Sequence, residues 1–403
     1  MITHLVIENF KAIKRLGITL TPFTVLIGGN SCGKSTILQA LDFIRAFAMR
    51  DIDEYLHERG WLFDDLKSQF GNGGVGISVG LKLNINGTAQ ELTWTIAVDN
   101  IDGKFLTSET IKNTSKSEVI LARGVDMPPI PDIIESLYLK SSYLKLIDEN
   151  NPSAEYCEEL YAVKKFFTQS SSYELLAPDR MREKGSRGET KDIGMGGEKL
   201  AAYINGMSAV QKSNLNKMFS ELIGYAAKTT TEIKRSGWVD LFINESFSET
   251  KTKIKAAHIS DGLLRLLGLV AASIPGEKDK HVIPQNAIID VLNSGFVLLD
   301  EIEDGINPYL TEKVIAMLRM IISDFGKQII ITTHSPVMLN HFKQNEIIFM
   351  WRDDEGQIQA KPMFDTEGML DTLDCFNPGE VWLNYSKDEI LDLMDPSRME
   401  GQK

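Results

Sequence analysis

The chain has 403 residues, of which 43% are hydrophobic and 25% charged, so it can bury a full core and its composition excludes a disordered protein. Its 43 basic and 56 acidic residues give a net charge of −13, which excludes a chain-wide basic field for nucleic acid and leaves any DNA contact to a local patch or a partner. Three scattered cysteines and the absence of any apolar run near the roughly 18 residues of a membrane span predict a cytoplasmic protein with no membrane partner.

The N-terminal segment has the pattern of a strand, a break and a second strand. Apolar residues alternate from Leu5 to Phe10, the pattern breaks from Lys11 to Gly17, and a short apolar strand follows from Thr24 to Ile27. Helical periodicity then runs from about Ser35 to Met49.

The next segment, from Gly71 to Lys104, is typical of an antiparallel sheet. Alternating stretches from Gly76 to Leu83 and from Glu91 to Val98 flank the turn at Asn86-Gly87, a residue pair that favours a two-residue hairpin. We expect this sheet to lie beside the core.

The middle of the chain is interpreted as an inserted helical lobe. After a proline cluster at 128–131, helical periodicity runs through Ile133 to Phe167 and Glu198 to Ile223. Between them, the glycine-rich and charged segment from Gly185 to Gly197 predicts an exposed loop.

The last part returns to a helix and strand rhythm, with strands at Phe296 to Leu299 and Gln328 to Thr333 around a helix at Leu310 to Asp324, which favours a parallel α/β sheet. Farther on, Asp353 to Gly356 predicts a polar hairpin turn. Both ends of the chain therefore build one core. The predicted domains are the N-terminal half of the core with the antiparallel β lobe in 1–125, the inserted lobe in 126–254, the C-terminal half of the core in 255–345 and a C-terminal extension in 346–403.

A glycine-rich loop between the strand at Thr24 and the helix at Ser35 is the strongest chemical signal. Glycines let backbone N–H groups face phosphate oxygens, and the helix adds its positive N-terminal end. A chance turn is the alternative, but the strand and helix context favours phosphate binding, with Lys34 on the β- and γ-phosphates of ATP and Ser35 on Mg²⁺. The predicted binding residues are Gly28, Asn30, Ser31, Cys32, Gly33, Lys34, Ser35 and Thr36.

Two acids follow the apolar strand at Phe296 to Leu299. Because the carboxyl ends of parallel strands face the ligand crevice, Asp300 is placed to hold Mg²⁺ and Glu301 to polarise the attacking water. Such a pair is also a common strand end, but the phosphate loop favours the catalytic interpretation.

A histidine ends the next apolar strand and precedes Pro336. A lone histidine is more often structural, yet the spacing from Asp300 by one helix and one strand predicts neighbouring strands. His334 is then positioned to donate a hydrogen bond to the γ-phosphate and the attacking water.

These three motifs, in this order, resemble the ABC-type ATPases of the RecF, structural-maintenance-of-chromosomes (SMC) and OLD (overcoming lysogenisation defect) group. The opening Leu5 to Lys11 is similar to the strand and Asn-Phe-Lys signature of those ATPase heads. The resemblance implies an α/β fold, namely a P-loop NTPase of the ABC-ATPase head type with an antiparallel β lobe and an inserted helical lobe.

The same family carries a signature motif that begins a helix before the acidic strand, and His258 to Arg265 is similar to its Ser-Asp-Gly variant. Ser260 and Gly262 would form an anion site that closes on ATP bound to a second copy, which implies a homodimer or higher homo-oligomer. Ser260 and Asp261 could also serve as an N-cap, and both readings are compatible. Asp304 to Pro308 stands where the family has its D-loop.

Two short segments, Leu176 to Arg180 and Gly196 to Glu198, resemble stretches in the ATPases of bacterial defence systems. For the arginines there, solvation is the default and contact with phosphate or DNA the alternative, and Gln69 is the nearest candidate for a Mg²⁺-sensing glutamine. The three arginines are Arg180, Arg182 and Arg187.

OLD-type nucleases carry a Toprim nuclease domain after the histidine strand, and the 69 residues after His334 lack its acidic pattern. We therefore expect an ATPase that regulates a separately encoded effector, a nuclease or toxin, in an anti-phage defence or toxin-type system similar to PARIS or Septu, with DNA or a phage protein as candidate trigger. A RecF-like DNA repair ATPase is the alternative, and a transporter motor is disfavoured by the missing Ser-Gly-Gly-Gln.

Overall fold

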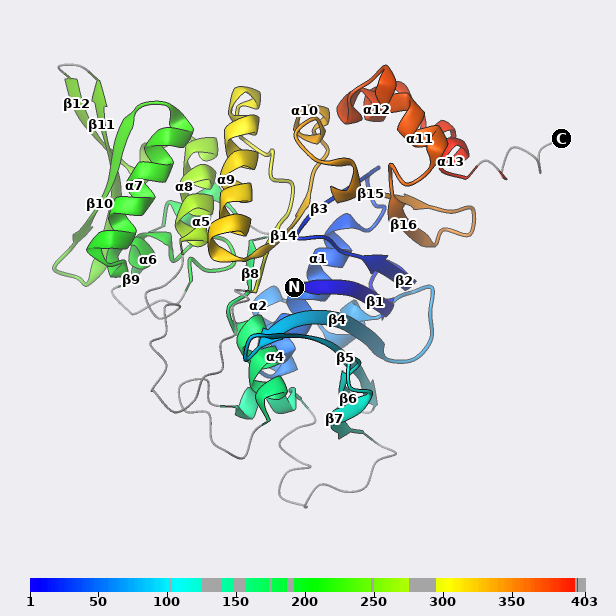
Figure 1. The fold of residues 1–403 in the computed structure, drawn as a ribbon. Helices are drawn as coiled ribbons and strands as arrows, with labels where there is room; N and C mark the ends of the chain where they lie inside the picture. The colour runs from blue at the N-terminus through cyan, green and yellow to red at the C-terminus, as the bar shows by residue number, and fades with distance from the viewer. Residues whose placement is uncertain are drawn as a thin grey trace. The chain divides into compact units, whose positions relative to one another are not determined.

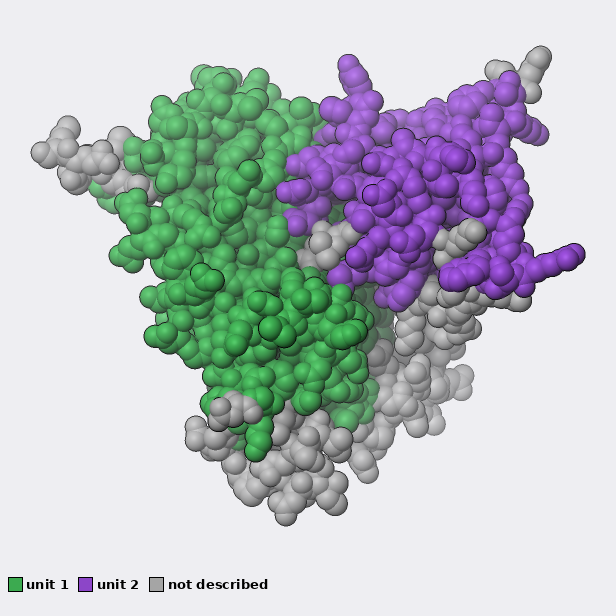
Figure 2. Space-filling view, turned by 180° about the vertical axis from the view of Figure 1, so that it is seen from behind, with its two compact units in different colours: residues 1–172, 284–299, 326–403 green, residues 173–283, 300–325 purple. Residues whose placement is uncertain are grey.

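The structure is a computed structural model in which the chain divides into two compact units (Figure 2). The first comprises Met1–Ser172, Pro284–Leu299 and Gly326–Lys403, and the second Tyr173–Ile283 and Asp300–Phe325. The residues described are 1–101, 103–124, 140–147, 157–173, 176–183, 185–186, 192–247, 250–274, 295–395 and 397.

The first unit contains a six-stranded antiparallel sheet in the order β2-β1-β4-β5-β6-β7. The hairpin expected around Asn86-Gly87 is present, with Ile85 paired to Thr88. Alternation explains the sheet, because every second residue of β4 is buried. The strands are β1 (Ile2–Phe10), β2 (Ile13–Thr19), β4 (Val75–Ile85), β5 (Thr88–Ile101), β6 (Lys104–Asn113) and β7 (Glu118–Arg123).

The break expected from Lys11 to Gly17 is wrong, because β2 occupies most of that segment and pairs antiparallel with β1. Asn9 and Lys11 adopt positive φ angles of 52° and 48°, which reverse the chain between the two strands. The polar residues that interrupt the apolar pattern face outward, and Arg15 forms an exposed ion pair with Glu8 at 3.3 Å.

A second six-stranded sheet, in the order β16-β15-β3-β14-β13-β8, carries the predicted motifs. The strands β15, β3, β14 and β13 are parallel, and β16 runs antiparallel to β15. Helix α1 (Lys34–Phe47) contacts β1 of the first sheet and β3, β13 and β14 of the second, so it lies between the sheets (Figure 1). The strands are β3 (Phe23–Gly28), β8 (Ser171–Tyr173), β13 (Phe296–Leu299), β14 (Gln328–Thr332), β15 (Ile347–Arg352) and β16 (Ile358–Pro362).

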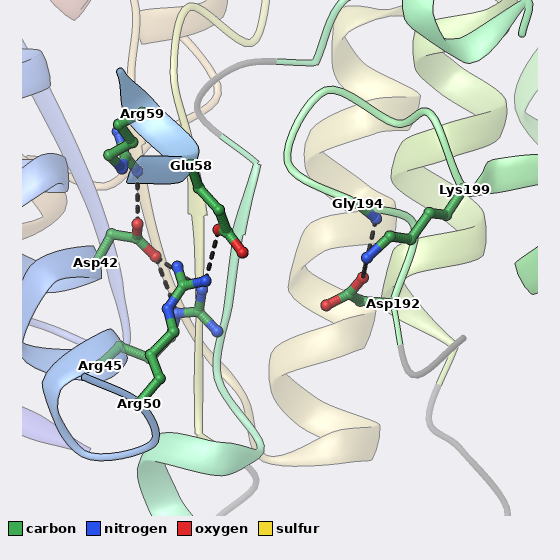
Figure 3. A network of polar contacts seen from close by, with 8 residues as sticks. All are labelled: Asp42, Arg45, Arg50, Glu58, Arg59, Asp192, Gly194 and Lys199. Atoms are coloured by element: carbon green, nitrogen blue, oxygen red, sulfur yellow. Dashed lines mark hydrogen bonds and ion pairs between the residues drawn. The ribbon is translucent and has the colours of Figure 1, made fainter. Parts of the chain in front are cut away.

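A buried ion cluster joins α1 to helix α2 (Ile52–Arg59). Asp42, only 2% exposed, accepts hydrogen bonds from Arg45 at 2.9 Å and from Arg59 at 2.5 Å (Figure 3). Burial favours a higher pKa for Asp42, but the two arginines outweigh it and hold the pKa below its usual value. The cluster fixes the buried side of the helix that follows the glycine-rich loop.

The segment expected as a C-terminal extension adds strands to the core sheet. Ile347 pairs with Val25 and Met350 with Gly28, so β15 is the parallel neighbour of β3. The predicted hairpin turn is present, because the Gly356 N–H donates to the Asp353 carbonyl at 2.9 Å. The short helix α10 (Pro336–Leu339) precedes the hairpin in the sequence. Three more short helices follow it: α11 (Glu367–Asp371), α12 (Pro378–Asn384) and α13 (Lys387–Met394).

The region expected as an inserted helical lobe contains the helices predicted from Glu198 to Ile223, but its last part is not helical, because residues 226–255 form an antiparallel sheet in the order β10-β11-β12, with β9 also paired to β11. Threonine-rich strands hide this sheet from apolar periodicity. Of the predicted helix from 133 to 167, residues 133–139 and 148–156 lie outside the described part, and α4 (Glu158–Thr168) is its end in the first unit. The second unit contains α5 (Pro178–Met181), β9 (Gly185–Ser186), α6 (Leu200–Gly206), α7 (Ala209–Ile223), β10 (Ala226–Ile233), β11 (Trp238–Phe247), β12 (Thr250–Lys255), α8 (Asp261–Ser273) and α9 (Thr311–Phe325).

Candidate functional site

The glycine-rich loop joins β3 directly to α1. Gly28 ends β3, and a Cβ atom there would lie 2.2 Å from the Met350 carbonyl oxygen, so the strand pairing leaves no room for a side chain. Ser31 and Gly33 have φ angles of 61° and 90°, which curl the backbone before α1 begins at Lys34. The strand, loop and helix that phosphate binding requires are therefore all present.

The Lys34 side chain closes this loop. Its ammonium group donates hydrogen bonds to the Gly28 and Gly29 carbonyl oxygens, both at 3.0 Å, and the residue is 6% exposed. Gly29 and Asn30 are exposed at the outer turn. The Cys32 thiol is buried beneath, where desolvation raises its pKa despite the nearby lysine. The loop thus presents a positive charge within a ring of backbone groups.

Arg352 contacts the same loop and was missed from the sequence. Its Nε donates to the Ser31 carbonyl oxygen at 2.8 Å, and its guanidinium carbon lies 5.8 Å from the centre of the Phe70 ring. Phe70 follows Gln69, which is exposed. Arg352 therefore contacts both the glycine-rich loop and the segment that carries Gln69, the candidate Mg²⁺-sensing glutamine. The position of Arg352 depends on the pairing of β15 with β3.

Three adjacent parallel strands end at one edge of the central sheet. Thr332 of β14 pairs with Leu26 of β3, so His334 follows β14 beside the start of the loop. The structure therefore brings Lys34 and His334 to the same sheet edge. His334 is half-buried, and the next residue, Ser335, caps α10 by accepting from the Met338 N–H at 3.3 Å.

The two predicted acids follow β13, which pairs with β14 as expected. Asp300 comes directly after Leu299 and is half-buried, whereas Glu301 is exposed. Glu301 has a φ of 44°, a left-handed conformation that is uncommon for a residue with a side chain and is found preferentially at functional sites. The two acids are the first residues of the segment Asp300–Phe325, the second of the two stretches of chain that form the second unit.

The predicted signature turn begins α8 in the second unit. Ser260 has the N-cap position, but its side chain makes no capping hydrogen bond and is exposed. Gly262 packs against the segment after Glu301, because a Cβ atom there would lie 1.8 Å from the Gly305 carbonyl oxygen. Arg265 donates to the Asp304 carbonyl oxygen at 3.2 Å. The signature turn and the predicted D-loop are therefore in direct contact.

Arg182 holds the other side of the signature turn. It donates to the Ile259 carbonyl oxygen at 2.8 Å and pairs with the carboxylates of Asp261 and Asp179. This arginine therefore has protein partners and differs from the solvated default expected for it. Arg180 is exposed, and Arg187 lies outside the described residues.

The two segments that resemble defence ATPases lie side by side, because the Ala177 N–H donates to the Gly196 carbonyl oxygen at 3.1 Å. The turn before Gly196 is held by the Asp192 carboxylate, which accepts from the Gly194 N–H at 3.0 Å and lies 3.9 Å from the Lys199 ammonium group (Figure 3). These contacts order part of the segment predicted as an exposed loop.

Among the described residues, no group of three or more His, Cys, Asp or Glu side chains is arranged to hold a metal ion. None of the described helices has the length and apolarity to cross a bilayer.

Comparison with known proteins gives two family-model matches and one curated relative. The model "AAA ATPase domain" matches residues 1–121, and "AAA domain, putative AbiEii toxin, Type IV TA system" matches residues 241–340. The Old nuclease of Escherichia phage P2 is 22% identical over 367 residues, or 88% of this chain and 60% of the nuclease. The chain thus spans about 60% of the length of that relative.

A solved structure of an SMC head shares the fold. A SmcHead bound to the C-winged helix domain of ScpA superposes with a TM-score of 0.50 at 16% identity, covering 89% of this chain and 96% of that one. A Smc head with an extended coiled coil, bound to the C-terminal domain of ScpA derived from Pyrococcus furiosus, gives a TM-score of 0.49 at 17% identity, covering 93% and 99%. The chain is therefore similar to AAA-type ATPases over both family-model segments and to the OLD relative over most of its length, and it shares the ATPase-head fold of an SMC protein.

Proposed function

We propose that this chain binds ATP at the loop from Gly28 to Thr36 and hydrolyses it. The observation that carries the proposal is the Lys34 ammonium group, held at 3.0 Å by two loop carbonyls directly before α1. Entry of a polyphosphate would exchange those weak partners for charged oxygens, which form stronger hydrogen bonds with an ammonium group. The helix N-terminus and the exposed loop N–H groups support the same ligand.

The residues around the sheet edge fit Mg²⁺-dependent hydrolysis. Ser35 and Asp300 would hold Mg²⁺, which keeps several waters and usually takes only one or two protein ligands beside phosphate oxygens. When bound, the ion would offset the charge on the β- and γ-phosphates. Glu301 would orient and deprotonate the attacking water, and His334 would donate a hydrogen bond to the transferring phosphate.

Dimerisation would complete the site. Ser260 leaves its hydroxyl outside the N-cap hydrogen bond, and the start of α8 offers unpaired N–H groups, which together suit a phosphate supplied by another copy of the chain. We infer that Ser260 and Gly262 close on ATP held by a partner, so that hydrolysis requires a homodimer or a higher homo-oligomer.

Two variants test the ATPase proposal. Lys34→Ala should abolish ATP binding or turnover, whereas Glu301→Gln should bind ATP, stop turnover and accumulate as a larger species in light scattering with ATP and Mg²⁺. Turnover at the parent rate by Glu301→Gln would show that another group activates the water. A Glu301→Gln protein that binds ATP and remains monomeric would contradict the partner-facing role of Ser260.

We also propose that the ATPase regulates a separate effector, a nuclease or toxin, in a cytoplasmic anti-phage or toxin-type system. Support comes from the match to a toxin-type AAA model and from the similarity to a nuclease. Tagged Glu301→Gln protein should be purified with ATP from phage-infected cells and, separately, from uninfected cells. The effector should co-purify from only one of these two preparations. Retention of no nuclease or toxin in either state, while the variant still dimerises, would contradict effector control.

A further inference from the structure

The sheet β10-β11-β12 has two chemically different faces. Helices α6 and α7 pack on one of them (Figure 1), where Val239, Leu241 and Ile243 of β11 are buried. Side chains alternate between faces along a strand, so the residues between these three point to the opposite face. That face is polar and carries an unusual density of lysine.

Strand register places four lysines of the two outer strands on this opposite face. Lys255 lies across from Phe242, Lys253 and Lys228 flank Asn244 from either side, and Lys251 lies across from Ser246. Lys234 joins them, because it reaches Glu232 and Asp240 at 3.4 and 3.5 Å. We call this surface the lysine face, and its charged residues are Lys228, Lys234, Lys251, Lys253, Lys255, Glu232 and Asp240.

The lysine face keeps an excess of positive charge after its internal ion pairs are formed. Lys253 pairs with Glu232, and Lys255 pairs with Asp240 at 3.1 Å. Among the described residues, Lys251 has no ion pair, and it is exposed. Five cations against two acids on one surface contrast with a chain whose net charge is −13. The excess therefore marks a local site for an anionic ligand.

Aromatic rings lie among the lysines on the central strand. Trp238 is 46% exposed, and the Phe242 ring lies 4.3 Å from the Lys253 ammonium nitrogen. Lysines on outer strands also discourage sheet aggregation, but that role does not require an exposed tryptophan on the middle strand. A surface that combines cations with exposed aromatic rings can bind a single strand, because the cations contact its phosphates and the rings stack on its bases.

We propose that the lysine face binds single-stranded nucleic acid. The lysines would contact successive phosphates, and Trp238 would stack on an unpaired base, since a ring cannot reach the base faces within an intact duplex. The proposal concerns only the second unit and does not depend on the ATP site. Single-stranded DNA and RNA share the required chemistry, and direct comparison distinguishes them.

The test is fluorescence anisotropy of labelled mixed-sequence DNA and RNA 20-mers with the full chain, without ATP, over a series of salt concentrations. Lys251→Glu should weaken binding at least fivefold and reduce the slope of log K against log salt by about 0.7, the value for one phosphate contact on a single strand. The matched control is Lys217→Glu, at another exposed lysine, on α7, which should bind within twofold of the parent.

A second variant tests the stacking role. Trp238→Ala should weaken single-strand binding by about 5- to 100-fold with an unchanged salt slope, because a base contact rather than a phosphate contact is lost. Circular dichroism of each variant checks the fold. Equal affinity of Lys251→Glu and Lys217→Glu, no oligonucleotide binding by the parent, or duplex bound as tightly as single strand would overturn the proposal. ATP turnover in the same samples separates these outcomes from failure of the ATPase proposal.

Discussion

Gly262→Ala tests whether the signature turn depends on its close contact with the D-loop. The added Cβ would lie 1.8 Å from the Gly305 carbonyl oxygen, whereas carbon to oxygen contacts are ordinarily about 3.3 Å or more. The D-loop or the start of α8 must therefore shift by about 1.5 Å, and overpacking of this kind costs about 1–3 kcal/mol. Because a 1 Å misplacement can slow catalysis about 100-fold, we expect a similar loss in ATP turnover.

The assay pairs urea unfolding, followed by circular dichroism, with steady-state ATP turnover. The control is Gly206→Ala at the end of α6, where an added Cβ meets no atom within 4 Å. The control should match the parent in turnover and unfold at the same or a slightly higher urea concentration, because alanine favours a helix. If Gly262→Ala behaves like Gly206→Ala in both measurements, the contact has no role in positioning the signature turn.

Three further substitutions follow from buried or close contacts. Asp42→Asn should lower the free energy of unfolding by about 3–5 kcal/mol at pH 7, because buried arginines lose their charged partner. Urea titrations should show this deficit narrowing below about pH 4, since the stabilisation from a carboxyl with a lowered pKa is complete above its unfolded pKa and is lost as the pH falls through its folded pKa. Arg182→Ala should reduce ATP-dependent dimerisation in light scattering, because Asp261 then keeps an uncompensated charge at the signature turn, whereas a parent-like dimer would refute this. Gly379→Ala should lower the melting temperature, because its Cβ would lie 2.0 Å from the Pro336 carbonyl oxygen, and an unchanged value would contradict tight packing of α12 on α10.

The central sheet was predictable because its strands are short apolar runs that end at recognisable motifs. Strands β13 and β14 match their predicted positions within a residue, and α1 begins one residue before the predicted start. The helix between β13 and β14 was also placed correctly, since α9 shows strong apolar periodicity. Local pattern and motif order therefore specify both the strands and which of them are neighbours.

Strand β10 of the second unit was missed for a physical reason, whereas β11 was missed although Val239, Leu241 and Ile243 alternate along it. In β10 the buried residues Ala227 and Thr229 are small, and the one large apolar side chain of that face, Ile233, is 46% exposed. Its threonines favour a strand by β-branching rather than by hydrophobic alternation. Periodicity alone reads such a segment as a polar loop or an extension of the helical lobe.

Arg352 could not be recognised from the sequence, because its position at the loop depends on strand order. Nothing near Arg352 in the sequence indicates phosphate chemistry, and only the pairing of Met350 with Gly28 brings it to the Ser31 carbonyl. Arg182 was a candidate from its own segment, but its contact with Asp261, 79 residues away along the chain, was not predictable for the same reason. Long-range contacts of single arginines leave no periodic trace.

Two arginines pair with the acidic residues in and beside the Ser-Asp-Gly turn. Asp261 places a negative charge in the first turn of α8, where a helix favours anions, so its carboxylate would compete with an incoming phosphate. Arg182 pairs with that carboxylate, and Arg265 pairs with Asp304 at 3.4 Å. With both acids compensated, the start of α8 keeps its capacity for a phosphate. If the signature turn binds phosphate as proposed, Arg182 would offset the Asp261 charge, which a signature with glycine at this position would not carry.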